Sequence, residues 1–138
     1  MAIEQSMASS FKQQILLGEH DMDTDVIKIA LYTSAASLGP ATTVYSTSGE
    51  VVGTGYTAGG NTLTGATVAL SGTTAYVTFA NTTWTSVNFT ARAALIYNSS
   101  KANKAVAVLD FGSDKTSTTN FQIQFPAANS NAAIIRIA

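Results

Sequence analysis

The chain has 138 residues, of which 46% are hydrophobic and 11% are charged, and its formal net charge at pH 7 is −1. That length fits one domain with a hydrophobic core of its own. With no basic excess there is little counterion release to drive nucleic-acid binding, so DNA or RNA is not expected as a partner, and the absence of cysteine excludes disulfides and thiolate metal ligands.

Ordinary soluble domains carry about 25% charged residues, and in this chain Ser, Thr and Asn take their place. Another protein can cover such a surface without stripping water from many full charges. We therefore expect self-association or a large protein partner. The sequence has no signal-peptide layout and no apolar run near the ~18 residues of a membrane span, so we expect a product of the cytoplasm with no membrane partner.

Residues 1–24 are expected to form an N-terminal arm with one short helix. The first six residues look like a loose leader. Between residues 8 and 18, Phe11, Ile15 and Leu16 recur at helical spacing. This pattern predicts a short amphipathic helix, which either caps the β-core, the favoured interpretation, or becomes ordered on a partner.

Three carboxylates follow the helix in the sequence HDMDTD. Asp21, Asp23 and Asp25 have the one-three-five spacing of a calcium loop, but Val26 stands at position six instead of glycine and Tyr32 at position twelve instead of glutamate. The favoured interpretation is a solvated loop whose acids repel each other and help to set the start of the next strand. An ion on these three carboxylates remains the alternative.

From Asp25 onward, the spacing of hydrophobic residues changes to period two. Ile27, Ile29 and Leu31 fall on one face. Val26, Ala30 and Tyr32 fall on the other face, which Lys28 interrupts. This alternation of two apolar faces predicts a well-buried strand.

Further short strands are expected through the rest of the chain, with turn signals every eight to twelve residues or so. A short edge strand is also expected at Thr43–Tyr45. The main strands are predicted at Val51–Tyr56, Thr62–Leu70, Ala75–Phe79, Ser86–Thr90, Ala93–Tyr97, Ala105–Phe111, Phe121–Phe125 and Ala133–Ile137. With no helix between them, they exclude a βαβ fold and predict an all-β, antiparallel sandwich over residues 25–138, with a jelly roll as the expected topology.

Two of these strands predict which side chains face the core. Phe121, Ile123 and Phe125 alternate with glutamines, and Val68 and Leu70 alternate with Thr67 and an alanine. Apolar residues at period two should point inward and the polar ones toward solvent.

The strand at Ala105–Phe111 is apolar on both faces, so we expect it in the middle of the sheet. Arg92 and Asp110 are the two charges in the most apolar strands, and charges are rarely buried unpaired, so they are expected to form a structural ion pair. Trp84 is expected first as a core anchor and second as an interface anchor.

The glycine-rich stretch TGYTAGGNTLTG runs from Thr54 to Gly65. Its start imitates a dinucleotide-binding fingerprint, but that site needs a following helix, and here a strand is predicted instead. A hairpin or wide turn is favoured. His20 is the only histidine, and no nucleophile motif accompanies it, so we expect neither an enzyme nor a cofactor.

Read together, Gly53–Gly65, Arg92–Asn98 and Ala105–Thr116 resemble the small auxiliary capsid proteins of tailed bacteriophages, called cement or decoration proteins. The resemblance extends from about Tyr32 to Ile137. It implies a β-sandwich on the outer surface of an icosahedral shell, made in the host bacterial cytoplasm, that ties neighbouring major capsid subunits together. The implied partners are the major capsid protein and further copies of the chain, as a dimer or trimer.

The N-terminal segment through Leu17 and the loop at residues 53–60 are the candidate contacts, because both are expected to adapt their backbones on docking. The candidate interface residues are Phe11, Ile15, Leu16, Tyr56, Gly59, Gly60 and Trp84. A tail or fibre module that binds a host-surface glycan is the alternative, and it would use Tyr45, Tyr56 and Trp84 as exposed aromatics. A hydrolase is the least favoured class.

Overall fold

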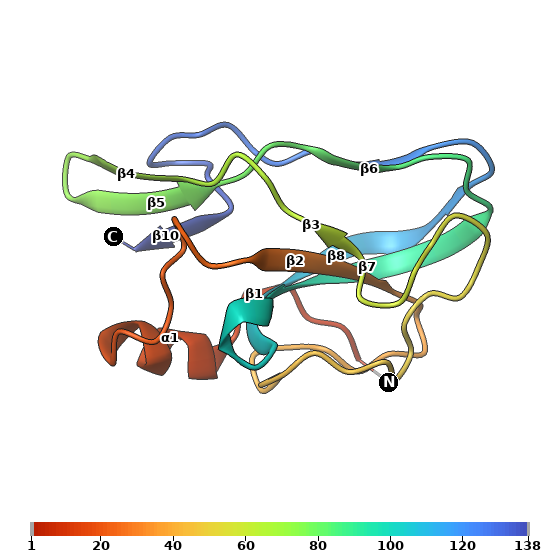
Figure 1. Ribbon diagram of the computed structural model, residues 1–138, viewed down its shortest axis with the longest axis horizontal. Coiled ribbons are helices and arrows are strands. Elements are labelled where there is room, and N and C mark those ends of the chain that lie inside the picture. The colour runs from red at the N-terminus through yellow and green to blue at the C-terminus, as the bar shows by residue number, and fades with distance from the viewer. Residues whose placement is uncertain (1, 138) are drawn as a thin grey trace.

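The computed structural model describes residues 2–137, and it confirms an all-β fold built from antiparallel sheets with one short α-helix (Figure 1). Strands account for 43% of the residues and helix for 8%, so β-pairing determines the architecture. Every pairing between strands is antiparallel. The elements are β1 Ser6–Met7, α1 Ser9–Leu16, β2 Ile27–Tyr32, β3 Asn61–Thr62, β4 Thr67–Ser71, β5 Thr74–Thr78, β6 Thr82–Trp84, β7 Phe89–Asn98, the 3-10 helix η1 Ser99–Lys101, β8 Lys104–Ser117, β9 Phe121–Ile123 and β10 Ile135–Ile137.

The main sheet has the strand order β1-β8-β7-β2-β3. Figure 1 shows it between two layers, with the smaller sheets above it and α1 and part of the β2–β3 connection below it. Both of its faces are therefore covered. This explains why β7 is apolar on both faces, with buried side chains from Ala93 to Tyr97, and why β2 is buried along nearly its whole length.

Two smaller sheets make up the second layer. One has the order β10-β5-β4, in which β4 and β5 form a hairpin closed by the two-residue turn Gly72–Thr73. The other pairs β6 with β9. Sheets of five, three and two strands do not confirm the jelly-roll topology.

The N-terminal residues belong to this core. β1 pairs with β8, and Ile3 forms a bridge with Leu38, so residues 3–7 are not a loose leader. Phe11 is fully buried in the hydrophobic cluster that includes both layers. The helix thus packs on the core, as the favoured interpretation expected.

Several predicted strands differ from the observed ones because chain pairing, not local pattern, decides where a strand ends. Residues 51–56 form no strand; apart from the Val51 N–H bond to Leu31 and a bridge from Thr54 to Asn88, they have no ladder. The run predicted at 62–70 is divided between β3 and β4, and Gly65, with φ of +64°, lies where the chain leaves one sheet for the other.

The remaining differences concern lengths and positions. The strands predicted at 86–90 and 93–97 are one strand, β7. It has a bulge at Arg92, where the facing part of β8 has more residues than β7, since Ala91 pairs with Lys115 and Ala93 with Asp110. β7 is the middle of the sheet, and β8, predicted there, lies beside it and continues to Ser117. The expected edge strand at 43–45 is a single bridge from Val44 to Lys104.

The inward residues of β9 are confirmed, since Phe121 and Ile123 are buried and Phe125 packs partly on the core. The prediction for β4 is wrong. Val68 is 50% exposed and Leu70 is 73% exposed, because no layer covers the outer part of the three-stranded sheet.

Candidate functional site

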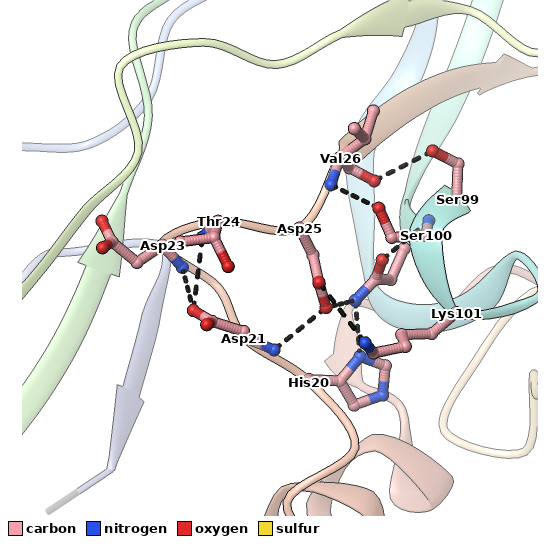
Figure 2. Close-up of polar contacts among 10 residues, drawn as sticks. His20, Asp21, Asp23, Thr24, Asp25, Val26, Ser99, Ser100 and Lys101 are labelled. Atoms are coloured by element: carbon pink, nitrogen blue, oxygen red, sulfur yellow. Dashed lines mark hydrogen bonds and ion pairs between the residues drawn. The ribbon is translucent and has the colours of Figure 1, made fainter.

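The three predicted carboxylates do not converge on a common point (Figure 2). Asp21 Oδ1 accepts hydrogen bonds from the backbone N–H groups of Asp23 (3.1 Å) and Thr24 (3.2 Å), while Asp23 directs its own carboxylate away from the others. Asp25 Oδ2 accepts from the N–H of Asp21 at 3.0 Å. Among residues 2–137, no three His, Asp or Glu side chains are arranged to hold a metal ion.

This loop instead fastens the start of β2 to the β7–β8 turn. Val26 N–H donates to Ser100 Oγ (2.8 Å), and Ser99 donates to the Val26 carbonyl from both its N–H and its hydroxyl. Lys101 Nζ lies 3.5 Å from Asp25 Oδ1. Although burial opposes ionisation of Asp25, the hydrogen bonds from Asn98 and Asp21 and the charge of Lys101 outweigh it and lower the pKa of that carboxyl. The interpretation that these acids set the start of the strand agrees with this network.

His20 lies in the same network with a defined tautomer. The Asn98 amide group is fully buried; its Nδ2 donates to Asp25 Oδ2 (2.8 Å) and lies 3.0 Å from His20 Nδ1. Since an amide nitrogen can only donate, His20 Nδ1 must accept, and the ring proton is assigned to Nε2, which donates to Gln14 Oε1 at 2.8 Å. The imidazole therefore holds α1 against the β7–β8 turn as a neutral group.

Stability should fall as the pH drops from 7 to 5. Burial, followed by the charge of Lys104, lowers the pKa of His20 below its ordinary 6.5. The unfolded chain therefore binds more protons than the folded one just below pH 6.5, so the stabilisation present above that pH is lost as the pH decreases. Urea denaturation at pH 7 and pH 5 should show a larger loss for the wild type than for His20→Gln, whose side-chain carbonyl can still accept from Asn98. Equal losses in the two proteins would contradict this role of His20.

A second polar cluster surrounds Glu50, which the sequence analysis did not identify. Glu50 is only 7% exposed, yet it has no cation within ion-pair distance among the described residues. Its Oε1 accepts from the Tyr45 hydroxyl (2.7 Å), and its Oε2 accepts from the Tyr56 hydroxyl (2.5 Å) and from Gly59 N–H (2.8 Å). Three donors thus replace the water that the carboxylate loses on burial.

The surrounding tyrosines extend this cluster into the main sheet. The Tyr97 hydroxyl donates to the Gly59 carbonyl (2.6 Å), and the Tyr97 ring stacks on Tyr45 with centroids 4.7 Å apart. Tyr56 Oη in turn accepts from Leu31 N–H at 2.9 Å. Burial and the nearby Glu50 charge raise the pKa of Tyr97 to about 12, and burial also raises the pKa of Tyr45 and Tyr56, so all three phenols stay protonated donors at neutral pH.

The loop at residues 53–60 is therefore a packed element, which corrects the expectation that it adapts on docking. Gly59 is buried, and Tyr56 is partly buried and bonded to Glu50. Gly60 lies directly against β2, where an added Cβ would be 1.8 Å from the Ile29 carbonyl oxygen. The only sequence signal for this arrangement is Glu50 itself, the last charge before a run from Val51 to Ala91 that has none.

Two other candidate interface residues are also inside the molecule. Phe11 is fully buried, and Trp84 is 4% exposed, packed against Tyr56 and Phe121 with ring centroids 6.2 and 6.1 Å away. Trp84 is thus a core anchor, as first expected, and neither side chain offers a surface to a partner.

Arg92 and Asp110 meet as expected, with Arg92 Nε 3.0 Å from Asp110 Oδ1. Both side chains are partly exposed. The N–H of Gly112, followed by Arg92, lowers the pKa of the Asp110 carboxyl. The pair lies at the β7 bulge and is a structural contact.

The remaining candidates, Ile15 and Leu16, lie on a surface groove of about 470 Å³ between α1 and β10. Leu16 is 88% exposed and Ile137 is 50% exposed. Leu17, the next residue along the chain, is 66% exposed. Lys12 and Arg136 line the same groove, and neither forms an ion pair among residues 2–137. We define this surface, which is lined by Met7, Lys12, Ile15, Leu16, Arg136 and Ile137, as the α1 groove.

The comparisons with known proteins identify no relative: no family model matches the sequence, no curated protein matches it, and no solved structure matches the fold. Among the described residues, the single α-helix is too short to cross a membrane.

Proposed function

We propose that this chain is a virion structural protein that binds the outer surface of an icosahedral phage capsid as a cement or decoration protein. The observation that supports this most is the α1 groove, where Leu16 and Ile137 stay exposed on a well-packed domain. Exposed apolar groups gathered at one place favour a contact with another protein, because covering them removes apolar surface from water. The major capsid protein is the proposed partner.

The charge distribution supports the same proposal. No charged residue occurs between Val51 and Ala91, so much of the second layer can be covered without desolvating ions. A rigid clip that binds only the expanded shell stabilises that state by mass action. Many identical copies on one particle make modest individual contacts sufficient.

Co-sedimentation with phage heads that lack this protein tests the proposal directly. Heads would be mixed with the purified chain before and after expansion, and the bound particles would then be heated. Stoichiometric binding to expanded heads with increased heat resistance is the expected result. No binding to either form would refute the cement role.

The α1 groove should be the contact surface. In the variant Leu16→Glu, binding to expanded heads should weaken about tenfold or more, because losing the burial of one leucine costs about 1.5–3 kcal/mol. Val52→Glu is the matched control, since Val52 is 96% exposed but does not line the α1 groove. If both variants bind like the wild type, the groove is not the contact.

The structure offers less support for the glycan-binding alternative. Trp84 is buried, Tyr56 is bonded to Glu50, and Tyr45 stacks on Tyr97 while it donates to Glu50. These three rings therefore do not form an exposed aromatic platform.

A further inference from the structure

The hairpin of β4 and β5 leaves one sheet edge open. β4 is the outermost strand in the order β10-β5-β4, and among the described residues its backbone groups bond to no segment other than β5. Figure 1 shows this hairpin at one end of the second layer. The two large apolar side chains of β4, Val68 and Leu70, are also exposed.

The register of the hairpin determines which backbone groups point outward. Ser71 pairs with Thr74 across the two-residue turn, and such a flanking pair exchanges both of its hydrogen bonds. Bonded and non-bonded pairs then alternate, so Ala69 bonds to Tyr76, while Val68 and Leu70 direct their N–H and C=O groups toward the open edge. The open edge thus offers the N–H and C=O groups of Val68 and Leu70 to a further strand.

Nothing on this strand protects it from pairing. Natural edge strands usually carry a lysine, a proline or an inward charge. Residues 67–71 read TVALS and contain none of these, and the charge-free run from Val51 to Ala91 includes the whole hairpin. Two copies can therefore approach along this edge without repulsion between like charges.

We propose that the occupant of this edge is a second copy of the chain, paired antiparallel through β4 about a two-fold axis at Ala69. In this register Val68 faces the partner's Leu70 and Leu70 faces the partner's Val68, so the outward groups of both strands bond to each other. The three-stranded sheets then join into one six-stranded sheet. The edge is self-complementary because the outward pair is symmetric about Ala69, and an isologous contact requires that symmetry.

The same pairing covers the exposed side chains. Paired residues across an antiparallel sheet lie on one face, so Val68, Val77 and Ile135 form one apolar row and Leu70, Ala75 and Ile137 form the next. The partner places its own Leu70 and Val68 beside these rows and extends them. This inference does not depend on the capsid role, since the dimer can be measured without any capsid.

A cysteine at Ala69 tests the register. At the proposed axis the two Ala69 residues form a non-hydrogen-bonded pair with Cα atoms about 4.5 Å apart, a spacing that a disulfide can span. Since the natural chain has no cysteine, Ala69→Cys should give one disulfide-linked dimer under mild oxidation. Thr73→Cys is the matched control, because Thr73 is exposed in the same hairpin but would lie about 27 Å from its copy.

Light scattering of the uncrosslinked proteins completes the test. The wild type should show twice the 14.3 kDa of one chain, and Val68→Lys should return to one chain while Trp84 fluorescence shows an unchanged fold. A wild type that stays monomeric at high concentration, a trimer, or equal crosslinking of the two cysteine variants would each overturn the β4 dimer. Failure to bind phage heads would refute the cement role and leave the β4 dimer unaffected, so the two proposals can fail separately.

Discussion

Replacing Gly60 by alanine is expected to destabilise the protein by more than about 3 kcal/mol. Gly60 has a φ of +76°, and an added Cβ would lie 1.8 Å from the Ile29 carbonyl oxygen and 2.8 Å from the Ala30 Cα. A contact this short cannot be relieved by a side-chain rotation, because the atoms it meets belong to the backbone of β2. The loop would have to separate from the sheet, which would also pull Gly59 away from Glu50 and Tyr97.

Gly18→Ala separates the steric effect from the backbone strain. Gly18 has nearly the same φ, +72°, but nothing lies within 4 Å of its added Cβ. This variant should therefore lose only the 1–2 kcal/mol or so that the left-handed conformation costs a residue with a Cβ. Urea unfolding followed by Trp84 fluorescence measures both variants. Similar losses would mean that the loop does not lie against β2 as described.

The second large effect is expected at Glu50, where Glu50→Ala should cost about 3 kcal/mol or more. The substitution leaves the hydroxyls of Tyr45 and Tyr56 and the N–H of Gly59 without their acceptor. Each buried donor that loses its partner costs about 1–3 kcal/mol. The loop should also become mobile, and amide hydrogen exchange at Gly59 should then rise toward the rate of an open loop.

Tyr45→Phe is the matched control for this cluster, since it removes one donor and leaves the carboxylate with two. Its cost should be near 1 kcal/mol, the usual net value of one hydrogen bond. In the double variant Glu50→Ala/Tyr45→Phe, part of the cost should be recovered, because one orphaned donor is gone. Additive losses would show that the two side chains do not interact.

These two positions also explain why we expect the loop at 53–60 to keep its conformation when a partner binds. Gly60 fixes the loop to β2 by close approach, and Glu50 fixes it by three hydrogen bonds. The two proposed contact surfaces are instead the α1 groove and the β4 edge, where Leu16, Ile137, Val68 and Leu70 are exposed on a helix and on strands. We expect docking without a large change in the backbone of either one.

The local pattern of the chain was sufficient for the fold class and for several core positions. Period-two alternation predicted that Ile29 and Leu31 are buried, and helical spacing predicted the short helix that carries Phe11. It also led to the pairing of Arg92 with Asp110, since charges in apolar strands need a partner. These features depend on which face of an element is apolar, and that information is contained within a few residues of sequence.

Alternation could not reveal which face would be covered. Val68 and Leu70 have the same pattern as Phe121 and Ile123, yet they are exposed, because covering a sheet face requires another layer from elsewhere in the chain. The Glu50 cluster was missed for a similar reason, since its donors come from residues 45, 56 and 59 and from no motif of fixed spacing.

The all-β class, the helix that carries Phe11 and the low charge of the surface could therefore be predicted from local residue pattern and composition. The strand order, the position of β7 at the centre of the sheet, the fixed loop at 53–60, and the exposure of β4 and the α1 groove became visible only in the folded chain. Local propensity and alternation act over neighbouring residues, whereas burial and hydrogen-bond satisfaction depend on which distant segments lie side by side after folding.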